Sequence, residues 1–353
     1  MKLHFCTLFD INYLERGLVL YESLEEVCKD FIIYIIAMDK MCYDILTKMN
    51  LSKAEIIFID NIEYKELKEA KDNRSFRAFC WTCSSWGLKY IFDTYNPYVC
   101  TYLDADEYFY SSPEKLIDGF VKSDANAAII GHNFGDERYA RIMRERSGTY
   151  CVQFNSFKRN SAGLRILNDW CMDCANECTD YFDGKRFGDQ KYLDNWVEKY
   201  DKVYIYTEIG AGVAPWNIYR FRRAKNKLED ENKYLFDLIS KKNWELFFIH
   251  YHSLIITDEY ADISVFTRYG RHDKRIIYRY YKGYIKKVIE IRSKIEEAYP
   301  DMKSQVGIRE HIRTGEKKSI INKMIDYGIM YYLYGAIKHR LYKKLDYVNV
   351  NNI

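Results

Sequence analysis

Two carboxylates, Asp104 and Asp106, stand one residue apart at the end of an apolar segment of this 353-residue chain. A third, Glu107, follows directly in the stretch TYLDADEYFYSS (101–112). Carboxylates this close repel one another, and a divalent cation removes the repulsion. Oxygen ligands favour Mg²⁺ or Mn²⁺, and an added imidazole favours Mn²⁺. Because a pair of carboxylates leaves coordination positions for phosphates, the pattern predicts a phosphate-bearing substrate.

The same segment also has a purely structural interpretation. Asp104 and Asp106 would then form a turn between a strand and a helix that begins near Ser111, Ser112 and Pro113. An Asp-x-Asp pattern by itself does not separate these two interpretations. The choice depends on which other side chains the fold brings to this place.

Apolar segments that alternate with amphipathic ones indicate the elements that must position these acids. Strands are expected at 3–9, 31–38, 55–60 and up to Leu103, and helices near 13–27, 41–50 and 79–92. This alternation predicts an α/β fold with a mostly parallel sheet flanked by helices. Ligands bind such sheets beyond the carboxyl ends of the strands, where Asp104 and Asp106 lie. Asp10 and Asp60 end other strands and are candidate lining residues.

Five stretches form an ordered series: TLFDINYLERGLVLYESL (7–24), TYLDADEYFYSSPEKLI (101–117), FGDQKYLDNW (187–196), GAGVAPWN (210–217) and FIHYHSL (248–254). The series resembles the motifs of the retaining glycosyltransferases of family 8, which have the GT-A nucleotide-sugar fold. The resemblance covers roughly residues 1–255, and the shared order is more specific than any single motif. It implies a GT-A catalytic domain over 1–255.

The resemblance also implies roles for individual residues. Asp104, Asp106 and His250 would hold Mn²⁺ or Mg²⁺, with His252 as the alternative imidazole because residues i and i+2 share a strand face. Asp189 would hold sugar hydroxyls, and Gln190 would lie near the anomeric carbon. The other residues assigned to the donor are Thr7, Asp10, Asn12, Tyr13, Arg77, Ala105 and Asn155.

Each of these residues has a structural alternative. Asp189 could cap a helix expected at 189–199, Asn155 could be a turn residue at a strand end, and either His could be a core residue. Arg74 and Arg77, expected to precede the helix at 79–92, could be exposed loop residues. The chain also departs from the family, because Ser253 replaces a common Gly and no basic Lys-Pro-Trp-like segment follows.

The C-terminal region differs from the rest in charge. Residues 261–353 carry 20 Lys or Arg against 10 Asp or Glu, which leaves 34 against 41 for the rest of the chain. Within a basic, aromatic-rich helical region at 256–353, the segments 275–299 and 321–345 have helical spacing. They fit a helix lying in a membrane interface, or a helical subdomain that packs on the core. Nucleic acid is not a predicted partner.

The start MKLHFCTLFD has no signal-peptide layout, so we expect a cytoplasmic protein whose ten cysteines are reduced. The basic tail would allow peripheral association with the inner face of the membrane. Cys171, Cys174 and Cys178 are expected to form one buried helix face. A zinc site that joins Cys80 and Cys83 to Cys171 and Cys174 is the alternative.

Taken together, the residues and the family resemblance imply a metal-dependent retaining hexosyltransferase. It would move a sugar from a nucleotide-sugar, expected to be a UDP-sugar, to a glycan or lipid-linked saccharide, as in surface polysaccharide synthesis. A metal-dependent nucleotide-sugar hydrolase or nucleotidyltransferase would use the same carboxylates and stays open as an alternative. A non-catalytic module that binds anionic partners would leave the ordered motifs unexplained.

Overall fold

The computed structural model describes residues 1–135, 137–224, 233–257, 260–262, 273–300 and 347–349. The chain packs as two compact units. The first consists of residues 1–213 and 244–250, and the second of residues 214–243 and 251–353. Four of the five ordered stretches lie wholly or partly before residue 214 and so belong to the first unit. The fifth stretch, 248–254, contributes residues 248–250 to the same unit.

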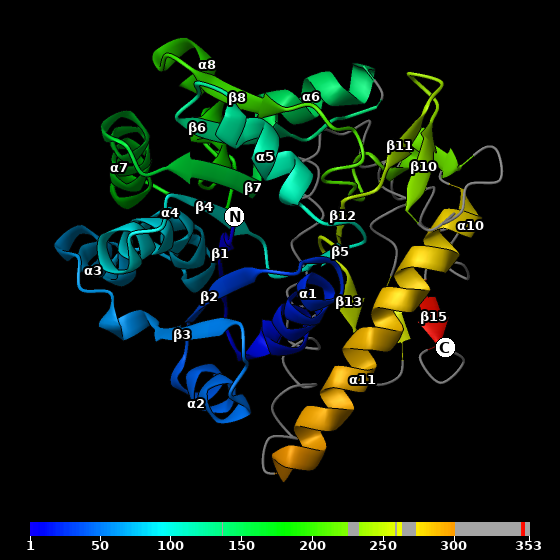
Figure 1. Ribbon diagram of the computed structural model, residues 1–353, viewed down its shortest axis with the longest axis horizontal. Coiled ribbons are helices and arrows are strands. Elements are labelled where there is room, and N and C mark those ends of the chain that lie inside the picture. Colours follow the sequence, from blue (N-terminus) through cyan, green and yellow to red (C-terminus); the bar gives the residue numbers. More distant parts are fainter. Residues whose placement is uncertain (136, 225–232, 258–259, 263–272, 301–346, 350–353) are drawn as a thin grey trace. The chain divides into compact units, whose positions relative to one another are not determined.

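A seven-stranded sheet of order β3-β2-β1-β4-β7-β6-β8 forms the centre of the first unit (Figure 1). Its strands are β1 (Leu3–Phe9), β2 (Phe31–Ala37), β3 (Ala54–Phe58), β4 (Val99–Leu103), β6 (Ala127–Gly131), β7 (Tyr150–Lys158) and β8 (Val203–Tyr206). Only β7 runs antiparallel to its two neighbours, β4 and β6; the other described pairs are parallel. The predicted α/β class, a mostly parallel sheet flanked by helices, is confirmed.

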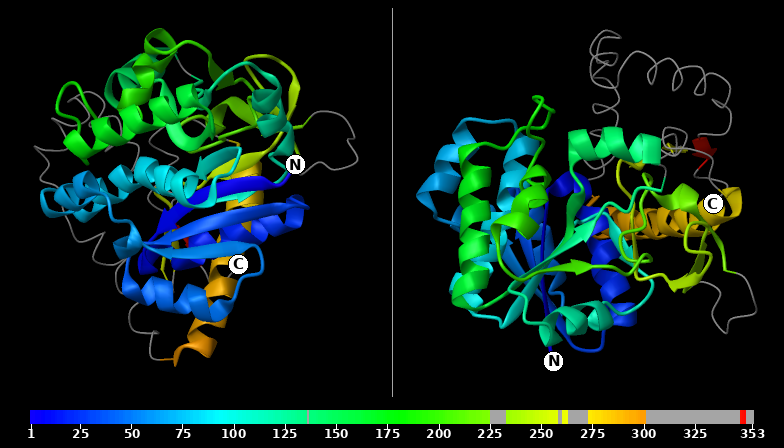
Figure 2. Two further views of the ribbon diagram at one scale, coloured as in Figure 1. Left: turned by 60° about the vertical axis from the view of Figure 1, so that its left-hand side comes forward. Right: turned by 90° about the horizontal axis from the view of Figure 1, so that it is seen from above.

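Helices cover both faces of this sheet (Figure 2). They are α1 (Leu14–Val27), α2 (Lys40–Met49), α3 (Lys65–Asp72), α4 (Phe76–Tyr95), α5 (Glu114–Lys122), α6 (Glu137–Ser147), α7 (Ser161–Asn176) and α8 (Trp196–Lys199), with 3-10 turns at Ile11–Tyr13, Ile59–Asn61 and Gln190–Asn195. On one face Cys6 and Ile36 share a core with Trp86 of α4 and Trp170 of α7. On the other face Gly17 of α1 lies against the ring of Phe9, where a larger residue would clash.

Side-chain caps explain where several helices begin. Asp39 accepts a hydrogen bond from the Cys42 N–H at the start of α2, and Ser75 accepts one from the Ala78 N–H at the start of α4. Each cap satisfies one backbone donor that the helix itself leaves without a partner. The element boundaries predicted from hydrophobic periodicity over residues 3–103 are confirmed to within a few residues.

A short antiparallel pair extends the first unit beyond the main sheet. Strand β5 (Glu107–Phe109) pairs with β12 (Phe248–His250), so that His250 lies opposite Glu107. Ile249 also forms a parallel bridge with Val213. A Cβ at Gly210 would lie 1.8 Å from the Glu245 carbonyl oxygen, so this close approach of two backbones requires glycine. The pair brings two distant parts of the sequence to one place.

The second unit contains short strands and a long helix. Its elements are a 3-10 turn (Ile218–Arg220), β9 (Phe221–Arg223), β10 (Tyr234–Asp237), β13 (Ile255–Ile256), β14 (Tyr260–Asp262), α10 (Lys274–Ile276), a π-helical turn (Ile277–Tyr281), α11 (Lys282–Ala298) and β15 (Tyr347–Asn349), while β11 (Asn243–Glu245) lies at the boundary of the units. The ring of Tyr251 stacks on Tyr284 with centroids 3.7 Å apart. Arg220 forms a buried ion pair with Asp237 at 2.7 Å.

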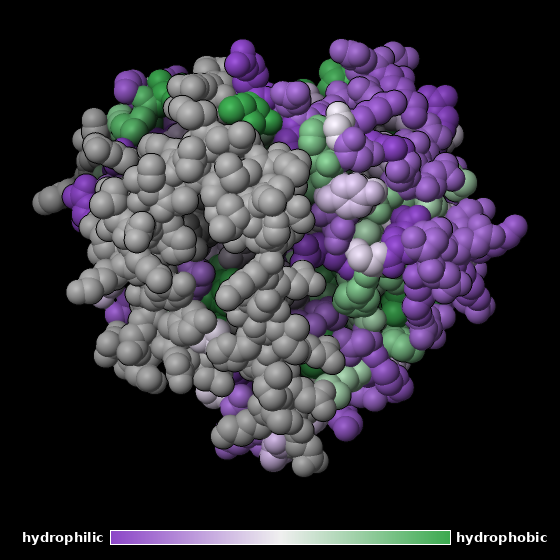
Figure 3. Space-filling view, turned by 180° about the vertical axis from the view of Figure 1, so that it is seen from behind, coloured by the Kyte–Doolittle hydropathy of each residue, from purple (hydrophilic) through white to green (hydrophobic). Residues whose placement is uncertain are grey.

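The helical character predicted for 275–299 is confirmed, whereas the segment 321–345 lies outside the described residues. Helix α11 buries Tyr284, Ile285 and Val288. Among the helices that the structure describes, none has the length and apolar character needed to cross a bilayer. The described part of the face in Figure 3 is mainly hydrophilic, with apolar residues in a narrow band.

Candidate metal and donor site

The predicted metal ligands come together at the carboxyl end of β4. Atom Nε2 of His250 lies 3.1 Å from Oδ1 of Asp106 and 3.8 Å from Oδ2 of Asp104. Asp104 and Asp106 follow β4 directly, while His250 arrives on β12. Asp106 and His250 are buried, and Asp104 is partly exposed. The structure thus joins three side chains that the sequence predicts as one group.

The other side of the His250 ring is held by Gln153, a buried residue on β7. Oxygen Oε1 of Gln153 lies 2.9 Å from Nδ1 of His250. Because an amide oxygen only accepts, Nδ1 carries the hydrogen and Nε2 is turned toward the carboxylates. A carbonyl partner of this kind orients an imidazole for metal binding. No sequence pattern indicates this role, because it depends on Gln153 of β7 meeting His250 of β12.

Burial and the charges within the cluster shift the pKa values of its side chains. Burial lowers the pKa of His250, but the carboxylates of Asp106 and Asp104 outweigh it and raise that pKa well above its usual range. Burial, partly opposed by His250 and reinforced by Asp106, raises the pKa of Asp104 to about 6. His250 and Asp104 thus hold their protons more tightly here than in water, and a bound cation would compete with those protons.

Glu107 is the residue of this site that sequence reasoning noted but did not assign. Its side chain is fully buried, and neither carboxylate oxygen has a hydrogen-bond partner among the described residues. Asp104, Glu107 and His250 each place one ligand atom within 4.8 Å of the others. A buried, unpartnered carboxylate beside oxygen and imidazole donors fits a divalent cation such as Mn²⁺ or Mg²⁺.

The alternative imidazole, His252, is exposed and belongs to the second unit. The reason for proposing it was wrong, because β12 ends at His250 and the two residues share no strand face. Its ring instead packs edge-on against Trp216, with centroids 5.4 Å apart. Of the two histidines, His250 is the one that contacts the carboxylates.

Asp189 does not play the helix-capping role that was its structural alternative. The helix expected at 189–199 is a 3-10 turn followed by the short α8, and the Asp189 side chain makes no capping hydrogen bond. Its carboxylate instead accepts a 2.6 Å hydrogen bond from Ser84 in the buried interior. The indole of Trp170 donates to the Asp189 carbonyl at 3.0 Å. Gln190 donates from Nε2 to the Ser147 carbonyl at 2.8 Å.

Asp189 lies close enough to the metal cluster to interact with it. Burial raises the pKa of Asp189 to about 7; the Ser84 hydrogen bond lowers it in part, and the Asp104 carboxylate raises it further. The two acids that the resemblance assigns to metal and sugar are therefore electrostatically coupled. Their separation along the chain, from 104 to 189, gives no hint of this coupling.

The substitution Asp189→Asn is expected to change how stability depends on pH. Between about pH 4 and pH 7 the folded chain keeps a proton on Asp189 that the unfolded chain has lost. Wild-type stability should therefore fall relative to the variant by about 1.4 kcal/mol per pH unit in that window and level off above it. Denaturant unfolding of both proteins from pH 4.5 to 8 measures the difference. A difference that does not vary with pH would show that Asp189 ionises near its usual pKa.

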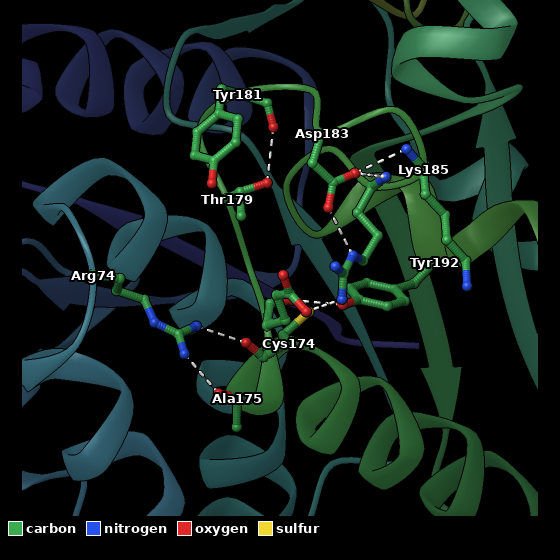
Figure 4. Close-up of polar contacts among 10 residues, drawn as sticks. Arg74, Cys174, Ala175, Thr179, Tyr181, Asp183, Lys185 and Tyr192 are labelled. Atoms are coloured by element: carbon green, nitrogen blue, oxygen red, sulfur yellow. Dashed lines mark hydrogen bonds and ion pairs between the residues drawn. The ribbon is translucent and has the colours of Figure 1, made fainter.

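The segment that leads to Asp189 is held by local polar contacts (Figure 4). The Asp183 carboxylate accepts hydrogen bonds from the backbone N–H groups of Lys185 and Arg186. The hydroxyl of Tyr192 donates to the Glu177 carbonyl at 2.6 Å, and the Gly188 N–H donates to the Thr179 carbonyl at 2.9 Å. These contacts fix the path of the chain into the Asp-Gln pair.

Arg74 has a structural role that the sequence did not suggest. Its guanidinium donates to the carbonyls of Cys174 and Ala175, at 2.7 and 2.6 Å, and so satisfies the C-terminal end of α7 (Figure 4). Arg77, expected before the helix, lies within the first turn of α4 and is exposed. The structure does not place either arginine next to Asp104 by any described contact.

The residues assigned to the nucleoside lie at the end of β1. Because β1 and β4 are parallel, with Cys6 opposite Tyr102, Asp10 and Asp104 reach the same edge of the sheet. Asp10 accepts a hydrogen bond from the Asn12 N–H at 3.1 Å, and the Arg16 guanidinium lies over the Tyr13 ring. Asp39, which the sequence did not single out, accepts a 2.7 Å hydrogen bond from the Ile11 N–H.

Three further donor candidates are buried in or after strands. Thr7 lies on β1 with its hydroxyl oxygen lacking a partner among the described residues, and Ala105 lies between the two metal acids. Asn155 was assigned to the donor, with a turn residue at a strand end as its structural alternative; it lies inside β7, opposite Tyr102, so the turn alternative is wrong. Asp60 is exposed and forms a 2.6 Å ion pair with Lys71, away from the acids named above.

The cysteines do not form the alternative metal site. Among the described residues, one set of His, Cys, Asp and Glu side chains lies close enough to share a metal. It consists of Asp104, Glu107 and His250 and contains no cysteine. None of the ten cysteines forms a disulfide. Cys171 and Cys174 lie buried on α7, but that helix ends at Asn176, so Cys178 is buried beyond it and not on the same helix face.

Comparisons with known proteins find relatives by sequence and solved structures by fold. No protein-family model matches it. Two uncharacterized proteins of Bacillus subtilis (strain 168) are similar. YfnD is 24% identical over 301 residues, which are 84% of this chain and 92% of YfnD. YfnF is 27% identical over 241 residues, which are 66% of this chain and 79% of YfnF.

Solved structures with similar folds include mouse xyloside xylosyltransferase 1, with a TM-score of 0.46 and 12% identity, covering 72% of this chain and 98% of that one. The galactosyltransferase LgtC, in complex with donor and acceptor sugar analogs, has a TM-score of 0.47 and 13% identity, covering 71% and 87%. At these values the similarity carries no assignment of activity, so function rests on the site.

Proposed function

We propose that this chain is a metal-dependent retaining glycosyltransferase that moves a hexosyl group from a UDP-sugar to a saccharide or lipid-linked saccharide, as in surface polysaccharide synthesis. The observation that carries the proposal is the meeting of Asp104, Asp106 and His250 at the carboxyl end of β4, with Asp189 electrostatically coupled to them. Ligand sites of α/β sheets lie at this edge. All these residues fall within 1–255, which we propose as the catalytic region.

Asp104, Asp106 and His250 would hold Mn²⁺ or Mg²⁺. A cation bound there stabilises, as a Lewis acid, the negative charge that develops on a departing nucleoside diphosphate. Gln153 keeps the Nε2 atom of His250 turned toward the acids through its 2.9 Å contact with Nδ1. The fully buried position of Gln153 excludes water from this contact.

Asp189 and Gln190 would act on the sugar. The Ser84 hydrogen bond fixes the Asp189 carboxylate in a position to accept hydrogen bonds from sugar hydroxyls. Gln190 is anchored through Nε2 to the Ser147 carbonyl, and an amide is a poor nucleophile. Retention would then proceed by attack on the face of the leaving group, with the departing phosphate oxygen accepting the proton of the acceptor hydroxyl.

The nucleoside would lie at the end of β1, where Asp10, Asn12 and Tyr13 form one 3-10 turn with its cap. The substitution Tyr13→Ala is expected to weaken binding of the free nucleotide by about 1–3 kcal/mol, because it removes an aromatic ring that would stack on the base. Titration calorimetry with UDP and Mn²⁺ measures the change. Tyr98→Ala, at an exposed position before β4, is the matched control. Equal affinity of Tyr13→Ala and wild type would place the base elsewhere.

A panel of nucleotide-sugars, each tested for stabilisation of the protein with and without Mn²⁺, tests the proposed function directly. A ligand that binds the folded chain raises its melting temperature, so the true donor should give a Mn²⁺-dependent rise. The donor is then incubated without acceptor. Slow hydrolysis agrees with a transferase, whereas rapid hydrolysis would favour the nucleotide-sugar hydrolase, and no Mn²⁺-dependent rise with any donor would contradict both.

In the proposed function the C-terminal region is a helical addition that takes no part in sugar transfer. Helix α11 buries Tyr284, Ile285 and Val288 and exposes Lys286, which supports a packed helix with lysines on its outer face. Peripheral membrane association is the alternative for the tail. It depends chiefly on the segment 321–345, which lies outside the described residues.

A further inference from the structure

We infer that Glu107 is an additional ligand of the cation, and that it makes the chain bind the metal before any nucleotide arrives. The inference deepens the proposed function and rests on it, because it concerns the same metal site. Two carboxylates and one imidazole would fill only part of a cation's coordination and leave much of the binding to the phosphates of the donor. A third carboxylate would let the protein itself supply more of the cation's coordination.

The first observation is the environment of Glu107. Its side chain has no exposed surface, and both oxygens lack a hydrogen-bond partner among the described residues. The backbone N–H of Asp104 stabilises the carboxylate slightly, but without the geometry of a hydrogen bond. Burying a carboxylate without partners costs several kcal/mol of folding free energy. A group buried at such cost is expected to have a partner, and a cation would be one.

The second observation is geometry. Glu107 begins β5 and lies directly opposite His250 of β12 in the antiparallel register. Residues opposite each other in such a pair have Cβ atoms about 5 Å apart, so their side chains reach the same point. The ligand atoms of Asp104, Glu107 and His250 lie within 4.8 Å of one another. Two ligands on opposite sides of a cation of this size lie about 4–5 Å apart, so one ion can contact all three.

The third observation is charge. With Asp106, whose Oδ1 lies 3.1 Å from Nε2 of His250, the group contains three carboxylates. Three ionised carboxylates and a divalent cation together carry a net charge of −1, whereas without the cation the acids repel one another. A cation would therefore gain three attractive charges from the protein before any phosphate is bound. A Glu107 that is protonated and merely fills space is the alternative, and it predicts no effect on metal binding.

The test measures Mn²⁺ binding to the full chain without nucleotide, by electron paramagnetic resonance of the free ion. Wild type is expected to bind one Mn²⁺, and Glu107→Gln to bind it at least tenfold more weakly. Tyr108→Phe is the matched control. It changes the next residue of β5, whose side chain points to the other face and donates to Glu26, and its Mn²⁺ affinity should stay within twofold of wild type.

A second measurement separates the ligand role from a structural one. Without metal, Glu107→Gln should melt at or above the wild-type temperature, because the amide removes a repelling charge; with Mn²⁺ it should lose the rise that wild type shows. If Glu107→Gln does not fold, Glu107→Asp keeps the charge but shortens the reach, and at least threefold weaker binding is expected.

The outcomes distinguish this inference from the proposed function. Mn²⁺ affinity that is unchanged in Glu107→Gln or Glu107→Asp but lost in Asp106→Asn would overturn the role of Glu107 and leave the metal site standing. Wild type that binds Mn²⁺ only when UDP is present would likewise overturn the inference. Affinity that is unchanged in Asp106→Asn as well would overturn the metal site itself and the proposed function with it.

Discussion

The substitution Asp106→Asn is expected to abolish donor cleavage while leaving the fold intact, and Asp104→Asn should do the same. Each change replaces a charged ligand by a neutral amide of the same shape. A metal contributes several kcal/mol to the stabilisation of developing charge, so the rate of nucleotide release should fall by about 1,000-fold or more. The measurement is release of free nucleotide from the donor at saturating Mn²⁺, with circular dichroism as the check on folding.

Asp118→Asn provides the matched control for these substitutions. Asp118 lies on α5, shortly after the acids, where its exposed side chain pairs with Lys122 at 3.8 Å. A surface pair of this kind contributes little, so activity should stay within twofold of wild type. If Asp106→Asn turned over the donor at a near wild-type rate, the assignment of the metal site would be wrong.

The second large effect is expected for Gln190. Gln190→Ala should slow transfer by about 100-fold, since a positioned amide dipole beside an electron-deficient anomeric carbon acts mainly in the transition state. Binding of the donor should change little, because the rest of the sugar and the nucleotide keep their contacts. Tyr192→Phe, which removes the hydroxyl that donates to Glu177 from the same 3-10 turn, is the control and should keep most activity.

Stereochemistry tests the same pair of residues from the product. A fold does not determine the chemistry of its site, so the fold cannot decide between inversion and retention. An inverting enzyme needs a general base at the acceptor hydroxyl, and the neutral Gln190 cannot supply one. An α-linked product is therefore expected from an α-linked donor, as read by proton NMR. A β-linked product would rule out retention and make Asp189, whose pKa is raised to about 7, the candidate base.

The sequence was sufficient for the four strands up to Leu103 because each of them is a local pattern, whereas β6 and β8 of the same sheet were not predicted. The alternation of buried and amphipathic segments over residues 3–103 determines the elements, and the right-handed connection of parallel strands limits their order. The reversed direction of β7 could not be predicted in this way. Asn155, assigned to the donor with a turn residue as its structural alternative, lies buried inside this strand.

Residues of the site were predictable only where they belong to a sequence motif. Asp104, Asp106 and His250 were found together, but the parts that orient them were not, since they depend on contacts between distant segments. The Ser84 hydroxyl meets Asp189 across 105 positions of sequence, and Gln153 meets His250 across 97. Glu107 was visible as a third acid, yet its burial opposite His250 follows from a pairing with β12 that no local pattern indicates.

The pairing of β5 with β12 has a consequence for the order in which the protein matures on the ribosome. All seven strands of the central sheet lie between residues 3 and 206, so a nascent chain can complete its sheet well before His250 emerges. At that stage Asp104, Asp106 and Glu107 have not yet met the imidazole of His250. A product that ends prematurely after β8 would therefore contain all seven strands of the sheet but not His250, so residues 248–250 are the last part of the cluster to be synthesised.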